Sequence, residues 1–83
     1  MRYELELMKK AMRDLEDIDR TMAARILAKL EIMRDNLQGD VKSLTNFTPR
    51  YRLRVGDYRV LFAVVGDKIE VHRVLHRRDV YRS

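Results

Sequence analysis

Two Gly-Asp pairs in the second half of this 83-residue chain constrain its fold more than any other feature. Gly56-Asp57 and Gly66-Asp67 separate three runs rich in β-branched and aromatic residues, at 50–55, 58–65 and 68–75. Glycine at the first central position supplies the positive φ of a type II′ turn, and such a turn joins two antiparallel strands. The pattern therefore predicts two tight hairpins in succession, which form a three-stranded antiparallel meander.

Two-residue turns also predict the register of the strands, because each turn determines which residues lie opposite one another. The predicted partners are Val55 with Tyr58, Arg54 with Arg59 and Arg52 with Leu61 in the first hairpin, and Val64 with Ile69, Leu61 with His72 and Arg59 with Val74 in the second. One face of this sheet is apolar, includes Leu75 and has one charge, at Arg73, and we expect helices to cover it. The opposite face carries Arg52, Arg54, Arg59, His72 and Val74, with His76 just beyond.

The first half of the chain changes its hydrophobic period twice. Residues 3–7 alternate between apolar and charged side chains, as in a half-buried strand. Residues 8–18 then show an apolar stripe at helical spacing, and a second stripe runs from an N-cap at Thr21 as far as Leu37. Residues 40–49 hold the only proline and are expected to form a loop.

These patterns together predict an α+β fold. It consists of an N-terminal strand, a two-helix antiparallel hairpin and the three-stranded antiparallel meander, with one sheet packed on the helices. A chain of this length forms a single small domain, residues 1–83.

The net charge of +5 lies entirely in the second part of the chain. Residues 1–49 hold nine cationic and nine acidic side chains, whereas residues 50–83 hold nine cationic and four acidic ones. Eight of those nine cations are arginines, whose planar guanidinium groups bind phosphate oxygens in pairs. The distribution predicts an anionic partner for the C-terminal part.

Composition excludes several classes of protein and site. The chain has no cysteine and two histidines, so we expect no disulfide, no structural metal and no cofactor. No run approaches the roughly 20 apolar residues that a membrane span needs, and no signal-peptide segment is evident. We expect a cytoplasmic protein without a membrane partner.

The predicted pairing of Arg54 with Arg59 brings two like charges together, which costs about 0.2–1 kcal/mol. A phosphodiester between the two guanidinium groups would offset this cost through charge-assisted hydrogen bonds. The alternative is that the arginines only solvate an exposed sheet face and oppose aggregation. His72 likewise has two interpretations, as an RNA contact or as a ring packed on the open sheet.

Two segments, residues 51–62 and 74–81, resemble the C-terminal sheet of the RelE/ParE toxin superfamily. The order of an N-terminal strand, two helices, a loop and the meander also follows that superfamily. The resemblance implies a toxin of a type II toxin–antitoxin system. On the RelE side it implies an endoribonuclease that cuts mRNA in the ribosomal A site, and on the ParE side a protein that inhibits DNA gyrase without cutting RNA.

The resemblance also implies the residues of the site. The basic pair of the first meander strand falls on Arg52 and Arg54, although RelE-type members often have lysine there, and the second-strand arginine falls on Arg59. The family's last basic residue falls on Arg77, beside His76, and its C-terminal tyrosine on Tyr81.

Such a site would promote attack of the ribose 2′-hydroxyl on the adjacent phosphorus, without a metal. In this hypothesis Arg59 and Arg77 stabilise the transition-state charge, while Arg52 and Arg54 position the phosphate. Either Tyr81 or His76 carries out the proton transfers. Arg78 and His72 are further candidate RNA contacts.

The implied partners are mRNA on the ribosome and a cognate RelB-like antitoxin, assembled with the toxin as a hetero-oligomer. An acidic, partly disordered antitoxin segment would cover the cationic face or displace the segment around Tyr81. Two alternatives stay open: a ParE-like gyrase inhibitor, and a protein that binds nucleic acid without cleaving it.

Overall fold

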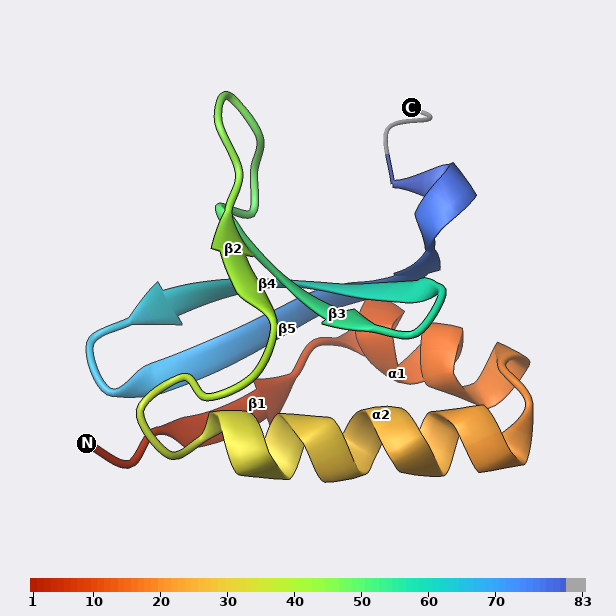
Figure 1. Ribbon diagram of the computed structural model, residues 1–83, viewed down its shortest axis with the longest axis horizontal. Helices are drawn as coiled ribbons and strands as arrows, with labels where there is room; N and C mark the ends of the chain where they lie inside the picture. Colours follow the sequence, from red (N-terminus) through yellow and green to blue (C-terminus); the bar gives the residue numbers. More distant parts are fainter. Residues whose placement is uncertain (81–83) are drawn as a thin grey trace.

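The computed structural model describes residues 1–80 as one mixed sheet with two helices on one side (Figure 1). The elements are β1 (Glu4–Leu7), α1 (Lys9–Asp17), α2 (Arg20–Met33), β2 (Val41–Ser43), β3 (Tyr51–Val55), β4 (Tyr58–Val65), β5 (Lys68–His76) and the 3₁₀ turn η1 (Arg77–Asp79). The strands lie in the order β1-β5-β4-β3-β2. β1 runs parallel to β5, and every other pair is antiparallel. The predicted α+β fold is confirmed.

Both predicted turns are present, and each has two residues. Gly56 and Gly66 have φ angles of 58° and 61°, and the aspartate after each glycine is not left-handed, as a type II′ turn requires. The register of the first hairpin is also confirmed, with Arg54 opposite Arg59 and Arg52 opposite Leu61.

The predicted register of the second hairpin is correct only near its turn. Val64 lies opposite Ile69, but Leu61 lies opposite Arg73 and not His72, and Arg59 lies opposite Leu75 and not Val74. A β-bulge causes the shift, because β5 has one extra residue between the partners of Phe62 and Leu61. That residue is His72, since Phe62 pairs with Val71 and Leu61 with Arg73.

The bulge reverses which residues of β5 face the helices. Val74, predicted to lie on the open face, is 3% exposed and belongs to the core, whereas Arg73 and Leu75, predicted for the helix face, line a hollow on the open side. His76 lies opposite Tyr58, which packs against the core on the helix side. The prediction that His76 adjoins the open face is therefore wrong.

Asp14 of α1 stabilises β5 beyond the bulge. β1 pairs with β5 only as far as Val71, so the backbone N–H of Val74 has no strand partner on that side. The Asp14 carboxylate accepts a hydrogen bond from this N–H at 2.8 Å and two from the Arg73 guanidinium at 2.8 and 3.1 Å. The hydrogen bond to Asp14 is the largest cause of a raised pKa of Arg73.

Both ends of α2 differ from the prediction. Asp19, and not Thr21, caps the helix by accepting a hydrogen bond from the backbone N–H of Met22 at 3.2 Å. The helix ends at Met33 and does not reach Leu37, because Asn36 and Leu37 have positive φ angles, both 57°.

The segment predicted as a loop, residues 40–49, contains a strand. β2 pairs with β3, and Lys42 lies opposite Arg52. This strand makes the sheet five-stranded and shortens the β2–β3 loop to residues 44–50.

The main core lies between the helices and the inner face of the sheet. Fully buried side chains of α2, Ile26, Leu30 and Met33, belong to one cluster with sheet residues that include Phe62 and Val60. Leu61 and Val80 are buried too, but they lie outside this cluster, on the open side. None of the helices in the described part of the chain is long and apolar enough to cross a membrane.

The β2–β3 loop and η1 both rise from the side of the sheet that the helices leave open (Figure 1). They stand at different ends of the sheet, and the outer faces of β3 and β4 lie between them. The open face of the sheet is therefore bordered by the β2–β3 loop at one end and by η1 at the other.

Candidate anion-binding site

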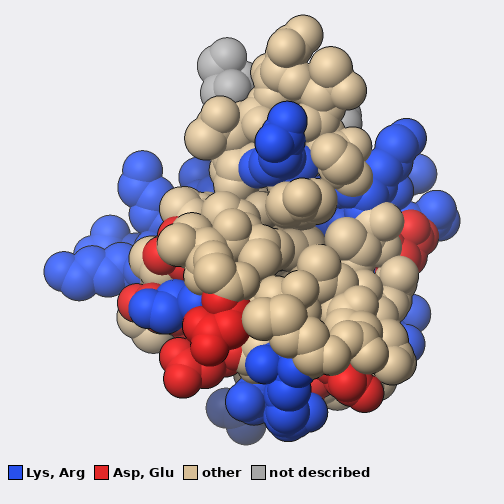
Figure 2. Space-filling view, turned by 90° about the vertical axis from the view of Figure 1, so that its left-hand side faces the viewer, with Lys and Arg blue, Asp and Glu red and all other residues tan. Residues whose placement is uncertain are grey.

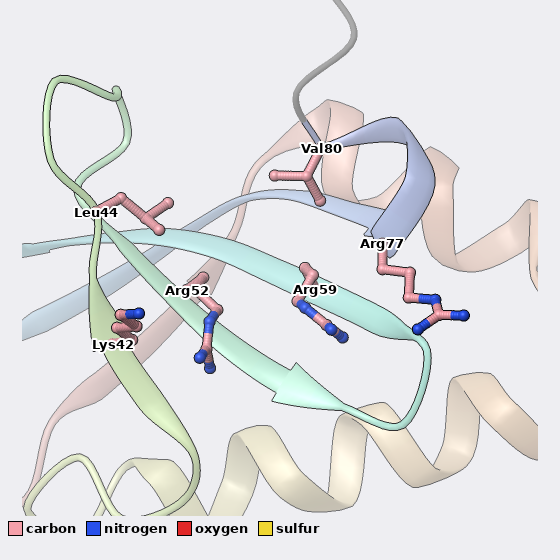
Figure 3. Close-up of a pocket in the computed structure, with 6 residues that line it drawn as sticks. All are labelled: Lys42, Leu44, Arg52, Arg59, Arg77 and Val80. Carbon is pink, nitrogen blue, oxygen red and sulfur yellow. The ribbon is translucent and has the colours of Figure 1, made fainter.

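A pocket of about 260 Å³ on the open face brings together cations from four elements. Figure 3 shows its lining, which consists of Lys42 from β2, Arg52 from β3, Arg59 from β4, Arg77 from η1 and the apolar side chains of Leu44 and Val80. The mixture of cations with two aliphatic walls suits a phosphate group attached to a less polar body. We call this cavity the cationic pocket.

Strand register explains why the cations meet. Lys42 lies directly opposite Arg52, and Arg54 directly opposite Arg59, so two like-charge pairs share the open face. Each such pair costs about 0.2–1 kcal/mol of folding free energy. The cationic pocket therefore exists despite its effect on stability.

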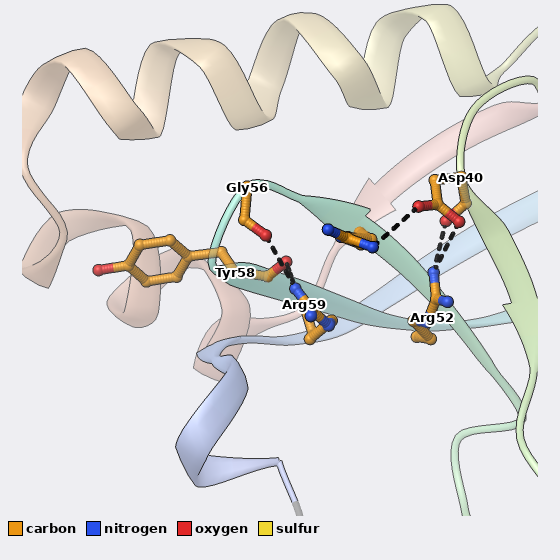
Figure 4. Close-up of polar contacts among 6 residues, drawn as sticks. Asp40, Arg52, Gly56, Tyr58 and Arg59 are labelled. Atoms are coloured by element: carbon orange, nitrogen blue, oxygen red, sulfur yellow. Dashed lines mark hydrogen bonds and ion pairs between the residues drawn. The ribbon is translucent and has the colours of Figure 1, made fainter.

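Asp40 partly neutralises this cluster, and its involvement was not predicted. Arg52 Nη1 donates to the backbone oxygen of Asp40 at 2.7 Å and to its Oδ1 at 3.1 Å (Figure 4). Arg54 Nη1 lies 3.9 Å from the other carboxylate oxygen. Both oxygens of Asp40 thus face arginines, and Arg52, whose side chain is 17% exposed, is held at the pocket wall.

Arg59 lies over the β3–β4 turn. Its Nη1 donates to the backbone oxygens of Gly56 and Tyr58, both at 3.0 Å (Figure 4). Burial lowers the pKa of Arg59, and the positive charges of Arg54, Arg52 and Arg77 lower it further. The charged guanidinium is therefore in an unfavourable field, which a bound anion would relieve.

Arg77 reaches the pocket from η1. Its backbone N–H donates to the Asp57 oxygen at 2.7 Å, and its Nε lies 3.8 Å from Asp57 Oδ1. These contacts join η1 to the β3–β4 turn. The Arg77 side chain is 65% exposed, so its guanidinium is open to a ligand.

The charge of this cluster exceeds what its carboxylates neutralise. Lys42, Arg52, Arg54, Arg59 and Arg77 supply five positive charges, and Asp40 and Asp57 supply two negative ones. Figure 2, which shows the molecule from one end, has cationic but no acidic side chains among the described residues around the projecting β2–β3 loop. This side of the molecule attracts anions.

His76 does not belong to the cationic pocket. Its ring meets that of Tyr58 edge-on, with centroids 5.4 Å apart, and its Nδ1 accepts a hydrogen bond from the backbone N–H of Arg78 at 3.3 Å. The residue was predicted beside the arginines because the bulge in β5 was not foreseen. In this arrangement Nδ1 is occupied and the ring packs on Tyr58.

The other predicted site residues have varied positions. His72 lies at the bulge, with Nε2 3.5 Å from Glu70 Oε1, and it lines a separate hollow of about 660 Å³ beneath the β2–β3 loop. Arg78 is exposed in η1. Tyr81, the predicted tyrosine of the site, lies outside the described residues.

Lys42 was missed because its strand is too short to show a period. Val41–Ser43 offers a single alternation, and it stands in a segment rich in turn-forming residues. The available signal was the position of a lysine between Val41 and Leu44, ahead of a strand with arginine at alternate positions.

Comparison with known proteins identifies the relatives of this chain. A family model described as the ParE toxin of the type II toxin–antitoxin system parDE matches residues 5–81. The chain belongs to this toxin family. Membership of the RelE/ParE superfamily, inferred above from resemblance, is confirmed.

Both branches of the superfamily occur among the similar proteins. The toxin RelE3 of Methanocaldococcus jannaschii is 43% identical to this toxin over 47 residues, 57% of this chain and 53% of RelE3, so the match spans about half of that relative. A chain in the crystal structure of the RelB-RelE antitoxin-toxin complex from Methanococcus jannaschii is 33% identical, with a TM-score of 0.75 over 90% of this toxin and 93% of that chain. A chain of the chromosomal ParDE system from P. aeruginosa, 15% identical, has the same fold, with a TM-score of 0.71 over 90% and 96% of the two chains.

Proposed function

We propose that this toxin is an endoribonuclease that cuts mRNA in the ribosomal A site without a metal cofactor. The cationic pocket is the observation that carries the proposal, since it offers three guanidinium groups and an amine around a space of about 260 Å³. The similarity to RelE toxins supports RNA as the substrate.

The proposed reaction is attack of a ribose 2′-hydroxyl on the neighbouring phosphorus, with departure of the 5′-oxygen of the next nucleotide. Negative charge on the phosphoryl oxygens grows in the transition state, and Arg59 and Arg77 are assigned its stabilisation. Arg52, held by Asp40, and Arg54 position the phosphate. Arg78 and His72 are assigned contacts to the RNA on either side of the phosphate that is cleaved.

The proton transfers require separate treatment. The resemblance assigns them to Tyr81 or His76, and the packing of His76 on Tyr58 favours Tyr81 as the base for the 2′-hydroxyl. A tyrosine acts as a base only where nearby cations lower its pKa. The ribosome would orient the mRNA, as a small site with few acid–base groups requires.

The test is primer extension on mRNA after brief expression of the toxin. Discrete cuts in register with codons are expected for the wild type, and none for Arg59→Ala/Arg77→Ala. The matched control is Arg13→Ala/Arg20→Ala, which removes two exposed arginines from the helical side and should cut normally. Uncut mRNA in wild-type cells whose growth has stopped would contradict the proposal.

Gyrase inhibition is the second candidate function, because the matching family model is described as a ParE toxin. It predicts intact mRNA, DNA damage and loss of supercoiling activity when purified toxin is added to gyrase. The same two double variants separate a role of the cationic pocket from a role of the helices in this activity.

We propose a RelB-like antitoxin as the cognate partner, in a toxin–antitoxin hetero-oligomer in the cytoplasm. An acidic segment of that antitoxin would cover the cationic pocket and block RNA. Copurification that weakens with added salt, and weakens further for Arg59→Ala/Arg77→Ala, is the expected result. Salt-independent association with both forms would assign the contact to another surface.

A further inference from the structure

The proposed reaction also needs a proton donor for the departing 5′-oxygen, and the cationic pocket restricts the choice. Three of its four cations are arginines, whose guanidinium groups do not release a proton under ordinary conditions. Leu44 and Val80 have no exchangeable side-chain proton. Among the described residues that line the pocket, Lys42 is the one with a transferable proton.

Other titratable groups near the pocket are already engaged. Both carboxylate oxygens of Asp40 face arginines, at 3.1 and 3.9 Å. His76 packs on Tyr58 and its Nδ1 accepts a backbone hydrogen bond. His72 lines the neighbouring hollow beside Glu70.

The position of Lys42 suits a donor. It lies opposite Arg52 on the open face, so the two Cβ atoms are about 4.5–5.5 Å apart and an anion held by Arg52 is within reach of a lysine side chain. Figure 3 shows Lys42 on β2, at the side of the pocket next to Arg52. Within residues 1–80 no carboxylate forms an ion pair with Lys42, in contrast to Arg52, Arg54 and Arg77.

We propose that Lys42 is a catalytic residue, the general acid of the cleavage reaction; the inference rests on the ribonuclease function proposed above. The bond from the 2′-oxygen to phosphorus forms as the bond from phosphorus to the 5′-oxygen breaks. The proton of the 2′-hydroxyl passes through the base assigned above to solvent water, and the Lys42 ammonium gives a proton to the 5′-oxygen. The products are a 2′,3′-cyclic phosphate and a 5′-hydroxyl end, and water returns the proton to the Lys42 amine.

A general acid must supply a proton as well as a positive charge, and a substitution at Lys42 can remove the first while keeping the second. Lys42→Arg keeps the positive charge but removes a donor that can give up its proton, and the exposed position accommodates the change without a loss of packing. The matched control is Lys29→Arg, because Lys29 is also an exposed lysine but lies in α2. Thermal unfolding of both variants should match the wild type.

The test uses ribosomes programmed with an mRNA that carries a mapped cleavage site, prepared with either the normal 5′-oxygen or a 5′-bridging sulfur at that site. A thiolate leaves without protonation, so the sulfur substrate does not need a general acid. Lys42→Arg is expected to cut the normal mRNA about 10²–10⁴-fold more slowly than the wild type. With the sulfur substrate the two proteins should cut at nearly equal rates, and Lys29→Arg should behave as wild type with both.

Two results would overturn the assignment of Lys42 alone: normal cleavage of the oxygen substrate by Lys42→Arg, or an equal slowing with both substrates, which would assign Lys42 to phosphate binding. If the wild type cuts neither substrate, the ribonuclease function fails together with the proposal. The wild-type reaction thus distinguishes the two failures.

Discussion

One nitrogen of Arg52, Nη1, donates to both the backbone carbonyl and the carboxylate of Asp40, at 2.7 and 3.1 Å. The residue that orients a main cation of the pocket therefore also supplies negative charge beside it. Orientation and charge can be separated experimentally, because the backbone contact does not depend on the side chain.

Asp40→Asn keeps a side-chain oxygen and the backbone contact to Arg52 but removes the negative charge. Affinity for single-stranded RNA should rise, and its salt dependence should steepen by up to about 0.7 in the slope of log K against log salt, as for one more neutralised phosphate. Fluorescence anisotropy titrations across a series of NaCl concentrations measure both quantities.

The matched control for Asp40→Asn is Asp67→Asn, which makes the same charge change in the β4–β5 turn, away from the pocket. Its salt slope should equal that of the wild type. Equal slopes for all three proteins would mean that Asp40 does not influence phosphate binding.

Sulfate should bind the cationic pocket and stabilise the toxin, because burial and the positive charges of Arg54, Arg52 and Arg77 lower the pKa of Arg59, and a bound anion favours its charged form. At equal ionic strength, replacing chloride by sulfate should raise the Tm of the wild type more than that of Arg59→Ala. A difference of 1 kcal/mol corresponds to about 4–8 °C for a domain of this size.

Arg13→Ala should keep the full sulfate effect, which controls for the general stabilisation of proteins by sulfate. A sulfate effect of equal size in Arg59→Ala would place the bound anion elsewhere.

Asp14→Ala should destabilise the fold by about 2–3 kcal/mol, because it removes hydrogen bonds from the Arg73 guanidinium and leaves the backbone N–H of Val74 without its partner. Urea denaturation measures the loss. Asp17→Ala, an exposed position on the same helix, should change the free energy of unfolding by less than about 0.5 kcal/mol. Unfolding midpoints that coincide for the two variants would show that Asp14 does not stabilise β5.

Gly56→Ala and Gly66→Ala should cost similar stability but differ in activity. Both glycines have φ near 60°, where an alanine costs about 1–2 kcal/mol. A Cβ on Gly56 would also lie 3.4 Å from Met22 Cε, whereas a Cβ on Gly66 would meet nothing within 4 Å. The carbonyl oxygen of Gly56 accepts a hydrogen bond from the Arg59 guanidinium. A change of backbone angle at position 56 would move this oxygen and with it Arg59. Cleavage of mRNA should therefore fall for Gly56→Ala and persist for Gly66→Ala. Equal cleavage by both variants, measured under conditions where they are fully folded, would contradict this role of the turn.

Local rules predicted the first hairpin and the pairing of Arg54 with Arg59, because a two-residue Gly-Asp turn leaves one register for the residues beside it. The same rules failed along β5. The bulge accompanies a contact with Asp14, which is 60 residues away from Val74 in the chain, and no pattern within the strand reports such a contact.

The candidate site was predictable to a similar extent. Arg52 and Arg59 were placed on the open face because they stand on strands with a recognisable period, and Arg77 was assigned from the family resemblance. Lys42 and Asp40 were not found, since a strand of three residues is recognised only through its partner. His76 was assigned to the wrong face by the same one-residue shift that misplaced Val74.

The bulge at position 72 determines which side of the sheet each later residue of β5 faces. Before it, odd-numbered residues of β5 such as Ile69 and Val71 point to the helices, and after it even-numbered ones such as Val74 do. If the same residues paired without a bulge at position 72, Val74 would point outward and Arg77 would lie away from the other cations. The geometry of the cationic pocket thus depends on where the extra residue of β5 is accommodated as well as on the chemistry of the side chains.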